Sequence, residues 1–258
     1  FLSRKKAEFG VGIARMEDRY FQTNIIDFSE AKHDKSTYSI FGGSIVLEGS
    51  TLNARQFATQ GSREKMAAQI FTGTEHFRPG TSKLTKDTPE PYKKVQSWLQ
   101  VSYQNETYHK LNPKFTLGAY LEAYYSSRNF SNNYTATLMQ AGEFTPTAHS
   151  KVTYNEAFRA NQYAGAGVMP IYQLSESFQL RGEFYGFVPI FPIKKDEYGQ
   201  AYYGKAFTKF EYLGEISLVF QLSFGSISAY VNHYSSPSND WNVGLTLGWQ
   251  LFNSRFIE

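Results

Sequence analysis

The end of the chain alternates between apolar and polar residues with a period of two. From Trp241 to Leu251 every second residue is apolar, and the residues between them are small or polar. A β-strand points successive side chains to opposite faces, so this pattern predicts a strand with one apolar face. The same alternation recurs at residues 115–124, 178–188, 211–222 and 226–232, and more weakly at 9–13, 20–28, 38–49, 62–72, 98–107 and 162–172.

The pattern predicts about eleven strands and no helix. Several strands are longer than the five or six residues that are about the norm in soluble proteins. Composition excludes several other classes of protein. Of the 258 residues, 17% are aromatic, which argues against a disordered chain. No apolar run approaches the roughly 18 residues of a membrane-spanning helix. The chain has no Cys for disulfides or thiol nucleophiles, and a net charge of +3 is too small to predict binding to nucleic acid.

Alternation alone does not separate a soluble β-sandwich from a transmembrane barrel, because both have one apolar face. Strand length favours the barrel, since a tilted membrane strand needs about 9–11 residues. Trp241 and Trp249 are spaced like the two aromatic girdles of such a barrel, about 20 Å apart along the membrane normal. The longest connections also fall at alternate positions, which is typical of a barrel with short turns at one end. We therefore expect an all-β, antiparallel transmembrane β-barrel.

Strand parity adds an expectation about completeness. With a tight turn at Met16–Asp18, eleven strands place residue 1 on the outer side if the C-terminus is periplasmic. Bacterial single-chain barrels have even strand numbers with both ends periplasmic. We therefore expect residues 1–258 to be one barrel domain that lacks strands at its N-terminal end.

The segment 49–62 resembles the "T-L-D…F-P-T-x-G" turn of the BamA-like outer-membrane assembly superfamily. The matching residues are Leu52, Phe57, Thr59 and Gly61, with Ala58 where proline is usual. The resemblance implies that eight strands follow the turn and that the longest external loop follows the third of them. It also implies that Arg159, in Phe158-Arg-Ala160, corresponds to the arginine of a "V-R-G-F" motif that folds back into the lumen.

The segments 183–187, 230–236 and 241–258 are similar to the barrel of patatin-like phospholipase proteins from Gram-negative bacteria. That family implies a patatin acyl-hydrolase domain, a small POTRA-like domain and a barrel of about sixteen strands. It also implies the bacterial outer membrane as the location. The last strand matches the terminal assembly signal of outer-membrane barrels at Asn242, Gly244, Leu247 and Trp249. Such a strand offers its edge to the barrel assembly machinery by β-augmentation.

The chain contains no hydrolase machinery of the patatin type. No serine has glycine at both −2 and +2, and no Asp-Gly dipeptide occurs, so any catalytic domain must lie outside this chain. Of the five histidines only His233 is beside a strand end, followed by Ser235 and Ser236; we interpret it as a rim residue rather than the base of a barrel-wall enzyme. No HExxH, carboxylate-rich metal loop or phosphate-binding loop occurs, so we expect no metal and no cofactor.

Charged residues in the polar phase should point into the lumen: Glu122, Arg181, Glu183, Glu211 and Glu215. They can serve as solvated pore lining. Alternatively, Arg159 enters the lumen and pairs with one of the carboxylates, which would make Arg159, Arg181, Glu183 and Glu215 a lock between loop and wall. The external loops carry further cations, which are either solvated or bridge lipopolysaccharide phosphates: Arg78, Lys83, Lys86, Lys93, Lys94, Lys194, Lys195 and Lys205.

These observations predict an outer-membrane barrel that anchors, and can help export, a patatin-like lipid acyl hydrolase not contained in this chain. The expected partners are outer-membrane lipids, lipopolysaccharide and the barrel assembly machinery, with no nucleic acid. The leading alternative is a stand-alone porin or transport barrel. An enzyme acting from the barrel wall and a soluble β-sandwich adhesin are the remaining alternatives.

Overall fold

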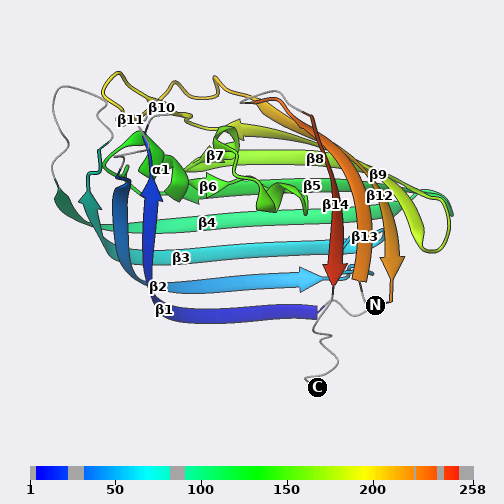
Figure 1. Ribbon diagram of the computed structural model, residues 1–258. Coiled ribbons are helices and arrows are strands. Elements are labelled where there is room, and N and C mark those ends of the chain that lie inside the picture. The colour runs from blue at the N-terminus through cyan, green and yellow to red at the C-terminus, as the bar shows by residue number, and fades with distance from the viewer. Residues whose placement is uncertain (1–3, 23–31, 82–90, 224, 237–240, 250–258) are drawn as a thin grey trace.

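The computed structural model describes residues 4–22, 32–81, 91–223, 225–236 and 241–249. Most of them belong to antiparallel strands of one large sheet (Figure 1). The large sheet contains β1 (Arg4–Tyr20), β2 (Asp34–Ser50), β3 (Gly61–Arg78), β4 (Tyr92–Lys110), β5 (Phe115–Ser126), β8 (Gln162–Gln173), β9 (Phe178–Pro189), β12 (Glu211–Leu222), β13 (Gly225–Tyr234) and β14 (Trp241–Trp249). The short elements are α1 (Tyr134–Gln140), β6 (Gly142–Glu143), η1 (Ser150–Val152), η2 (Glu156–Phe158), β7 (Arg159–Ala160), β10 (Ile193–Lys195) and β11 (Ala201–Tyr203).

The ten strands of the large sheet follow one another in chain order as an antiparallel meander. They are 9–19 residues long, and β1–β4, at 17–19 residues, extend beyond the segments that the alternation predicts. Short strands pair separately, β6 with β7 and β10 with β11. The predicted all-β, antiparallel architecture is therefore confirmed. Within the described residues β1 pairs with β2 and β14 with β13, and no hydrogen bonds between β1 and β14 close the sheet.

The N-terminal region differs from the prediction because β1 continues through residues 16–18, where a tight turn was expected. Glu17 stays in the strand and its carboxylate pairs with Arg19 and Lys35, at 2.7 and 2.5 Å. On the other face, Asp18 accepts a hydrogen bond from the amide of Gln140. The polar stretch is thus a strand end with partners on both faces. The expected separate strand at 20–28 is wrong at its start, its remainder lies outside the described residues, and the parity argument loses its basis.

Helix α1 was not predicted, because so short a helix has too few turns to show the hydrophobic period of an amphipathic helix. The side chain of Asn133 caps it by accepting a hydrogen bond from the backbone N–H of Ala136, at 2.8 Å. Ala136 is fully buried against Tyr20 and Phe77, so α1 packs on the inner side of β1 and β3.

No helix in the described part of the chain is long and apolar enough to cross a membrane.

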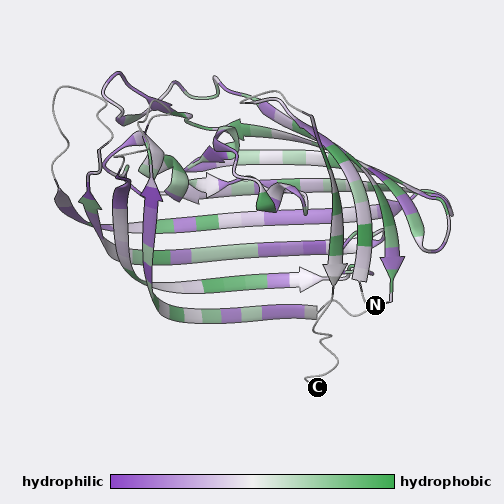
Figure 2. Ribbon diagram, viewed as in Figure 1, coloured by the Kyte–Doolittle hydropathy of each residue, from purple (hydrophilic) through white to green (hydrophobic). Residues whose placement is uncertain are grey.

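The large sheet carries its apolar side chains on the outer face. Strand register aligns outward-pointing residues of β1–β4 into rows across the four strands. Three successive rows are largely apolar, Ala7/Leu47/Met66/Tyr103, Phe9/Ile45/Ala68/Val101 and Val11/Gly43/Ile70/Leu99, and a fourth, Ile13/Phe41/Thr72/Ser97, is apolar on β1 and β2. We call these rows the apolar belt. We call the side of the belt toward the start of β1 lower, and the side toward the end of β1, where α1 lies, upper. The lower side has the polar row Lys5/Gly49/Glu64/Asn105, and on the upper side the outward residues become polar and cationic (Figure 2).

The sheet is strongly curved, and β1–β4 bend sharply toward the end where α1 lies (Figure 1). Gly73 of β3 sits in this bend, where a Cβ atom would come within 2.9 Å of the backbone carbonyl oxygen of Ser39. A side chain there would push the neighbouring strand away, so glycine permits the close approach. The curvature also brings the connection between β2 and β3 against β13, where the side chain of Ser226 donates a hydrogen bond to Gln56 at 3.0 Å.

Candidate functional site: the inner face and its plug

The inner face of the sheet is polar and charged. All five side chains predicted to point inward are buried there, with 2–7% of their surface exposed: Glu122, Arg181, Glu183, Glu211 and Glu215. A charged group at this depth is costly unless it is paired and hydrogen-bonded. Two segments that fold onto the inner face supply many of the partners. They are the plug (residues 127–161) and the β2–β3 turn (residues 51–60).

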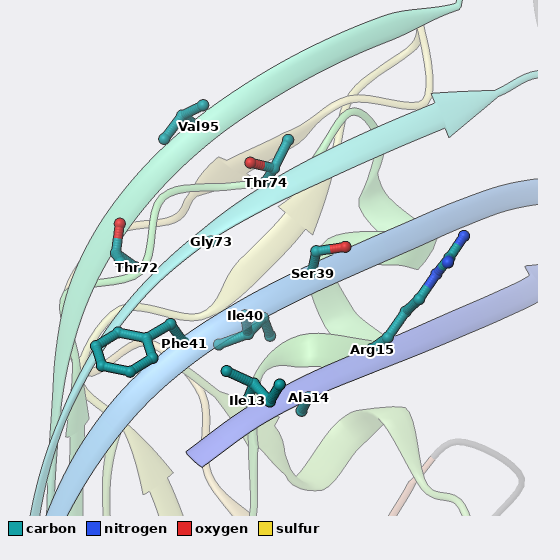
Figure 3. A pocket seen from close by; sticks show the side chains of 10 residues that line it. All are labelled: Ile13, Ala14, Arg15, Ser39, Ile40, Phe41, Thr72, Gly73, Thr74 and Val95. Carbon is teal, nitrogen blue, oxygen red and sulfur yellow. The ribbon is translucent and has the colours of Figure 1, made fainter. Parts of the chain in front are cut away.

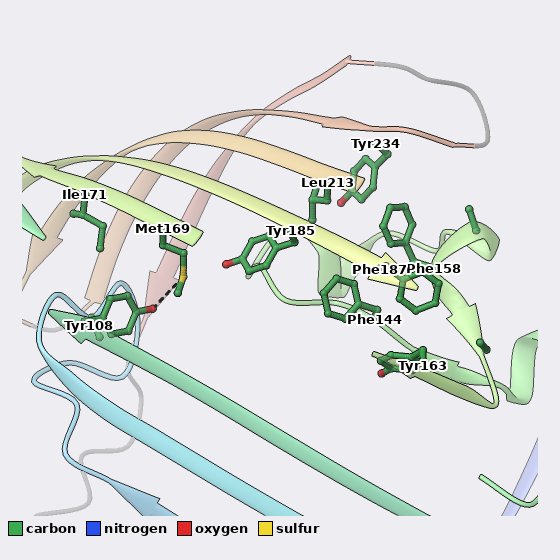
Figure 4. Close-up of a cluster of buried hydrophobic side chains, with 13 residues drawn as sticks. Tyr108, Phe144, Phe158, Tyr163, Met169, Ile171, Tyr185, Phe187, Leu213 and Tyr234 are labelled. Atoms are coloured by element: carbon green, nitrogen blue, oxygen red, sulfur yellow. Dashed lines mark hydrogen bonds between the residues drawn. The ribbon is translucent and has the colours of Figure 1, made fainter. Parts of the chain in front are cut away.

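The plug fills the concave side of the sheet with aromatic side chains. Phe158 packs on the rings of Phe187 and Tyr234, with centroids 5.6 and 5.7 Å apart. Phe144 stacks on Phe187 at 5.5 Å and meets Tyr163 edge-on (Figure 4). Plug and wall thus share one buried cluster that also reaches Ala58 of the β2–β3 turn. Aromatic contacts of this kind contribute about 0.5–1.5 kcal/mol each beyond their area.

A buried histidine links the plug to strands β12 and β13. The Nδ1 atom of His149 lies 2.6 Å from a carboxylate oxygen of Glu215 on β12, and both side chains are at most 3% exposed. The imidazole ring stacks on Tyr230 of β13, with centroids 3.6 Å apart. Asn232 donates a hydrogen bond to the second oxygen of Glu215 at 3.4 Å. This inner site therefore holds the plug by hydrogen bonding and ring stacking together.

Arg159 does not make the wall contact expected of it. Its guanidinium pairs with Glu143 at 2.7 Å, donates to the carbonyl of Met139 at 3.1 Å and lies over the ring of Tyr154. These partners all belong to the plug. The predicted pairing of Arg159 with a lumen carboxylate is wrong because β6 and β7 place Glu143 directly opposite Arg159. Arg159 therefore stabilises the internal fold of the plug.

Arg128, at the start of the plug, contacts the sheet through aromatic rings rather than through a carboxylate. Its guanidinium lies over the rings of Tyr38 and Trp98, 5.1 and 4.6 Å from their centroids. It donates to the side chain of Gln140 at 2.8 Å. Burial lowers the pKa of Arg128 from its ordinary value, although nearby Tyr38 and Glu75 oppose the shift. Arginine keeps its proton in proteins, so both contacts are cation–π interactions.

The residues of the predicted turn motif form a compact turn. Asn53 closes it, because its side-chain oxygen accepts hydrogen bonds from the backbone N–H groups of Thr59 and Gln60, at 3.0 and 3.1 Å. Phe57 takes a positive φ of 53° at the tip, and Leu52 packs against the buried aromatic cluster. The turn thus has a fixed shape that directs its backbone carbonyls toward the opposite wall.

We expect Gly61→Ala to destabilise this turn. Gly61 has a φ of 93°, and a Cβ atom there would collide with the backbone carbonyl of Thr51. The backbone would have to move, at a cost of about 1–3 kcal/mol. Thermal unfolding of the folded protein measures the loss. Ala54→Gly in the same turn is the control, and equal melting temperatures for Gly61→Ala and the unmodified protein would contradict the assigned role.

Arg181 of β9 fastens the β2–β3 turn to the wall. Its Nη1 atom donates to the carbonyl of Ala58 at 2.9 Å, and its Nε atom donates to Glu183 at 3.0 Å. The guanidinium also lies over the ring of Phe57, 5.6 Å from the centroid. The four predicted lock residues therefore separate into different contacts. Arg181 and Glu183 hold the turn, Glu215 holds the plug through His149, and Arg159 is not part of either contact.

The predicted assembly-signal residues lie on β14, the last strand of the sheet. Asn242 pairs with Asn232 of β13, and Leu247 is exposed on the outer face. Gly244 lies opposite Tyr230, and a Cβ atom there would come within 2.6 Å of the tyrosine hydroxyl. Gly244 thus leaves room for the ring on which His149 stacks. Trp249 pairs with Gly225 through its backbone, and its side chain lies outside the described residues.

His233 lies with aromatic residues of the outer face. Its ring is 4.8 Å from Trp241 and 5.8 Å from Tyr212. The hydroxyl of Ser235 instead donates a hydrogen bond to the carboxylate of Glu211. It also accepts a hydrogen bond from the backbone N–H of Tyr212 at 3.0 Å. The described residues contain no group of three histidine or acidic side chains that could hold a metal.

Sequence reasoning missed His149, Arg128 and Glu143. All three lie in irregular or very short elements, where no hydrophobic period assigns a direction to a side chain.

The fold and the site define an all-β protein whose curved sheet is apolar outside and polar inside, with its concave side filled by its own loop. Comparison with known proteins adds no assignment, because neither a protein-family model nor a curated protein matches the sequence.

Proposed function

We propose that this chain is the membrane-spanning wall of a bacterial outer-membrane protein, and that its plugged interior makes it an anchor. The observation that carries the proposal is the apolar belt. Its residues are among the most exposed large hydrophobic side chains of the protein, including Phe9, Val11 and Ile13 at 77–86% exposure. Soluble monomers rarely expose a contiguous apolar patch larger than a few hundred Å², whereas exposed large hydrophobic side chains here occur on all ten strands of the large sheet.

The dimensions of the belt support a bilayer as its environment. The first and fourth rows of the belt are six residues apart, about 20 Å along a strand, and the polar rows that flank it at Lys5 and Arg15 are ten residues apart, about 34 Å along a strand and about 25 Å along the normal of a tilted sheet. That height is near the apolar band of transmembrane barrels, which is about 25 Å. A soluble sandwich would bury its apolar face between two sheets. Here the inner face carries Glu122, Glu183 and Glu215, and the apolar face points away from the protein.

The plug favours an anchor over the porin alternative. Phe144 and Phe158 fill the concave side, and His149 and Arg128 attach the plug to β12 and to β2–β4. A porin needs a continuous water-filled path through its lumen. We further propose, from the resemblance of segments such as 183–187 and 230–236, that the anchored domain is a patatin-like lipid acyl hydrolase. The chemistry would belong to that domain.

We expect the purified chain to require detergent and to fold into a form whose gel migration changes on heating. An exposed apolar belt aggregates in water, and a folded sheet of this size keeps its compact shape in mild detergent at room temperature. The measurement compares heated and unheated samples, and tests insertion into phospholipid vesicles by flotation. A monodisperse protein without detergent, or a protein that stays at the bottom of the flotation gradient, would refute the membrane proposal.

Ion flux through the same vesicles distinguishes an anchor from a porin. An anchor with an ordered plug should give no more ion flux than empty vesicles, whereas a porin would conduct steadily. Persistent conductance by the unmodified chain would therefore favour the porin alternative. For the hydrolase proposal, the test is whether the DNA upstream of the codon for Phe1 encodes G-x-S-x-G and Asp-Gly in the same reading frame.

A further inference from the structure

A shallow groove of about 590 Å³ crosses the outer face of β1–β4 at the upper edge of the apolar belt (Figure 3). Ile13, Phe41 and Val95 provide its apolar lining, together with small residues such as Thr72 and Gly73. Arg15 extends from β1 at one end of the groove. The groove is thus apolar where it meets the belt and cationic at its upper end.

The row at the upper edge of the groove and the two rows above it contain several cations. Register places Arg15 with Ser39, Thr74 and Val95, and the next row contains His76 beside Lys93. The last row contains Arg19, Lys35 and Arg78. Glu17 is the acidic residue of these three rows, and it pairs with Arg19 and Lys35. Arg15, Arg78 and Lys93 have no ion-pair partner among the described residues, so their charges are available to a ligand.

At the same height, the outer face of β12–β14, near the other edge of the sheet, carries different side chains. The outward residues at the upper ends of β12–β14 are aromatic, with the rings of Tyr212, His233 and Trp241 in contact. A general preference for the membrane interface would give a similar composition on both sides. The concentration of cations on β1–β4 therefore points to a ligand bound on that side.

We propose that this face binds a phosphorylated glycolipid, with an acyl chain in the groove and phosphate groups on Arg15, Arg78 and Lys93. The proposal rests on the membrane function proposed above. Lipid phosphates attached to acyl chains match a groove that is apolar below and cationic above. Strands lie about 4.8 Å apart, so β1 and β4 spread the cations over about 14 Å. That width suits a sugar head group with two phosphates better than the single phosphate of a phospholipid.

The sequence suggested a larger set of cations for lipopolysaccharide, which included Arg78 and Lys93 but not Arg15. Lys94 donates to the carbonyl of Phe130 at 3.1 Å and Lys195 to the carbonyl of Gln22 at 3.2 Å, so both hold loops in place. Lys83 and Lys86 lie outside the described residues. Of that set, Arg78 and Lys93 are the two that the strand register places beside the groove.

The experiment measures binding of a fluorescent bis-phosphorylated lipid A to the folded chain in detergent. Parallel titrations use its monophosphorylated form, phosphatidylglycerol and inorganic phosphate. We expect the bis-phosphorylated lipid to bind at least tenfold more tightly than phosphatidylglycerol, and the double substitution Arg15→Gln, Arg78→Gln to weaken it about tenfold. Thr72→Trp, which fills the groove, should weaken binding while the charges remain.

The control substitution is Lys5→Gln with Arg55→Gln, which removes the same charge from the opposite end of the sheet, where both side chains are exposed. An equal loss of lipid A binding in the control would show that net charge alone causes the effect, and it would overturn the proposed site. Equal binding of phosphatidylglycerol would overturn the choice of glycolipid, and competition by inorganic phosphate at equal concentration would show a free-phosphate site. Flotation with phospholipid vesicles is done first. Failure to float refutes the membrane proposal, whereas flotation without lipid A binding refutes this inference alone.

Discussion

Replacing Arg181 with alanine is expected to lower the free energy of unfolding by about 3–5 kcal/mol, which corresponds to a fall in melting temperature of about 10 °C. The substitution removes hydrogen bonds to Ala58, Gln179 and Glu183, and it leaves the carboxylate of Glu183 with Tyr185 as its remaining hydrogen-bond partner. An acidic group buried without a cation costs more than the lost contacts themselves.

The measurement is thermal unfolding of the folded chain, followed by circular dichroism or by the heat-dependent change in gel migration. Arg63→Ala is the matched control. Arg63 also pairs with two carboxylates, Glu48 and Glu106, but its side chain is 36% exposed, so we expect a change of about 0–1 kcal/mol. A second variant, Arg181→Ala with Glu183→Gln, should recover part of the stability because it removes the unpaired charge. Equal melting temperatures for Arg181→Ala and Arg63→Ala would contradict the tether between turn and wall.

Replacing His149 with phenylalanine is expected to loosen the plug by about 3 kcal/mol while the large sheet stays folded. Phenylalanine can still stack on Tyr230, so the variant removes mainly the bond to Glu215 and the contact with Ser228. Glu215 would then be a buried carboxylate with Asn232 as its remaining hydrogen-bond donor. The consequence should appear as greater mobility of the plug.

Ion flux through vesicles reports this mobility directly. We expect His149→Phe to conduct intermittently where the unmodified chain does not, and limited proteolysis to cut it between residues 127 and 161. His109→Phe, at an exposed position near the end of β4, is the control and should change neither property. Glu215→Leu with His149→Phe replaces the polar pair by apolar groups and should restore closure. An unaltered flux and cleavage pattern in His149→Phe would show that the aromatic cluster alone holds the plug.

The period-two pattern was sufficient to predict the strands and the direction of their faces, because both depend on local alternation. It placed Glu122, Arg181 and Glu215 inside correctly, since each lies in the polar phase of a long strand. The same reasoning misread residues 16–18. There both phases are polar, because the outer residue Glu17 lies above the apolar belt and the inner residue Asp18 meets the plug.

The partners of the plug could not be predicted in this way. Arg159 contacts Glu143 because the two-residue strands β6 and β7 pair with each other. The separation of 16 residues between Glu143 and Arg159 does not indicate this contact. His149 reaches Glu215 across 66 positions through a path set by the fold of the loop. Which carboxylate a loop side chain meets is therefore decided by tertiary packing.

The β2–β3 turn has a consequence for the order of folding. Its bonds to β9 and β13 join residues separated by 123 and 170 positions, whereas the strands on either side of the turn pair locally. Contacts so distant in sequence form late, because the ends of a long chain must first be brought together. Ala58 can meet Arg181 after β9 has been added and the growing sheet has rolled inward. Engagement of this turn would then mark the completion of folding, and a fluorescent probe on Gln56 would time it.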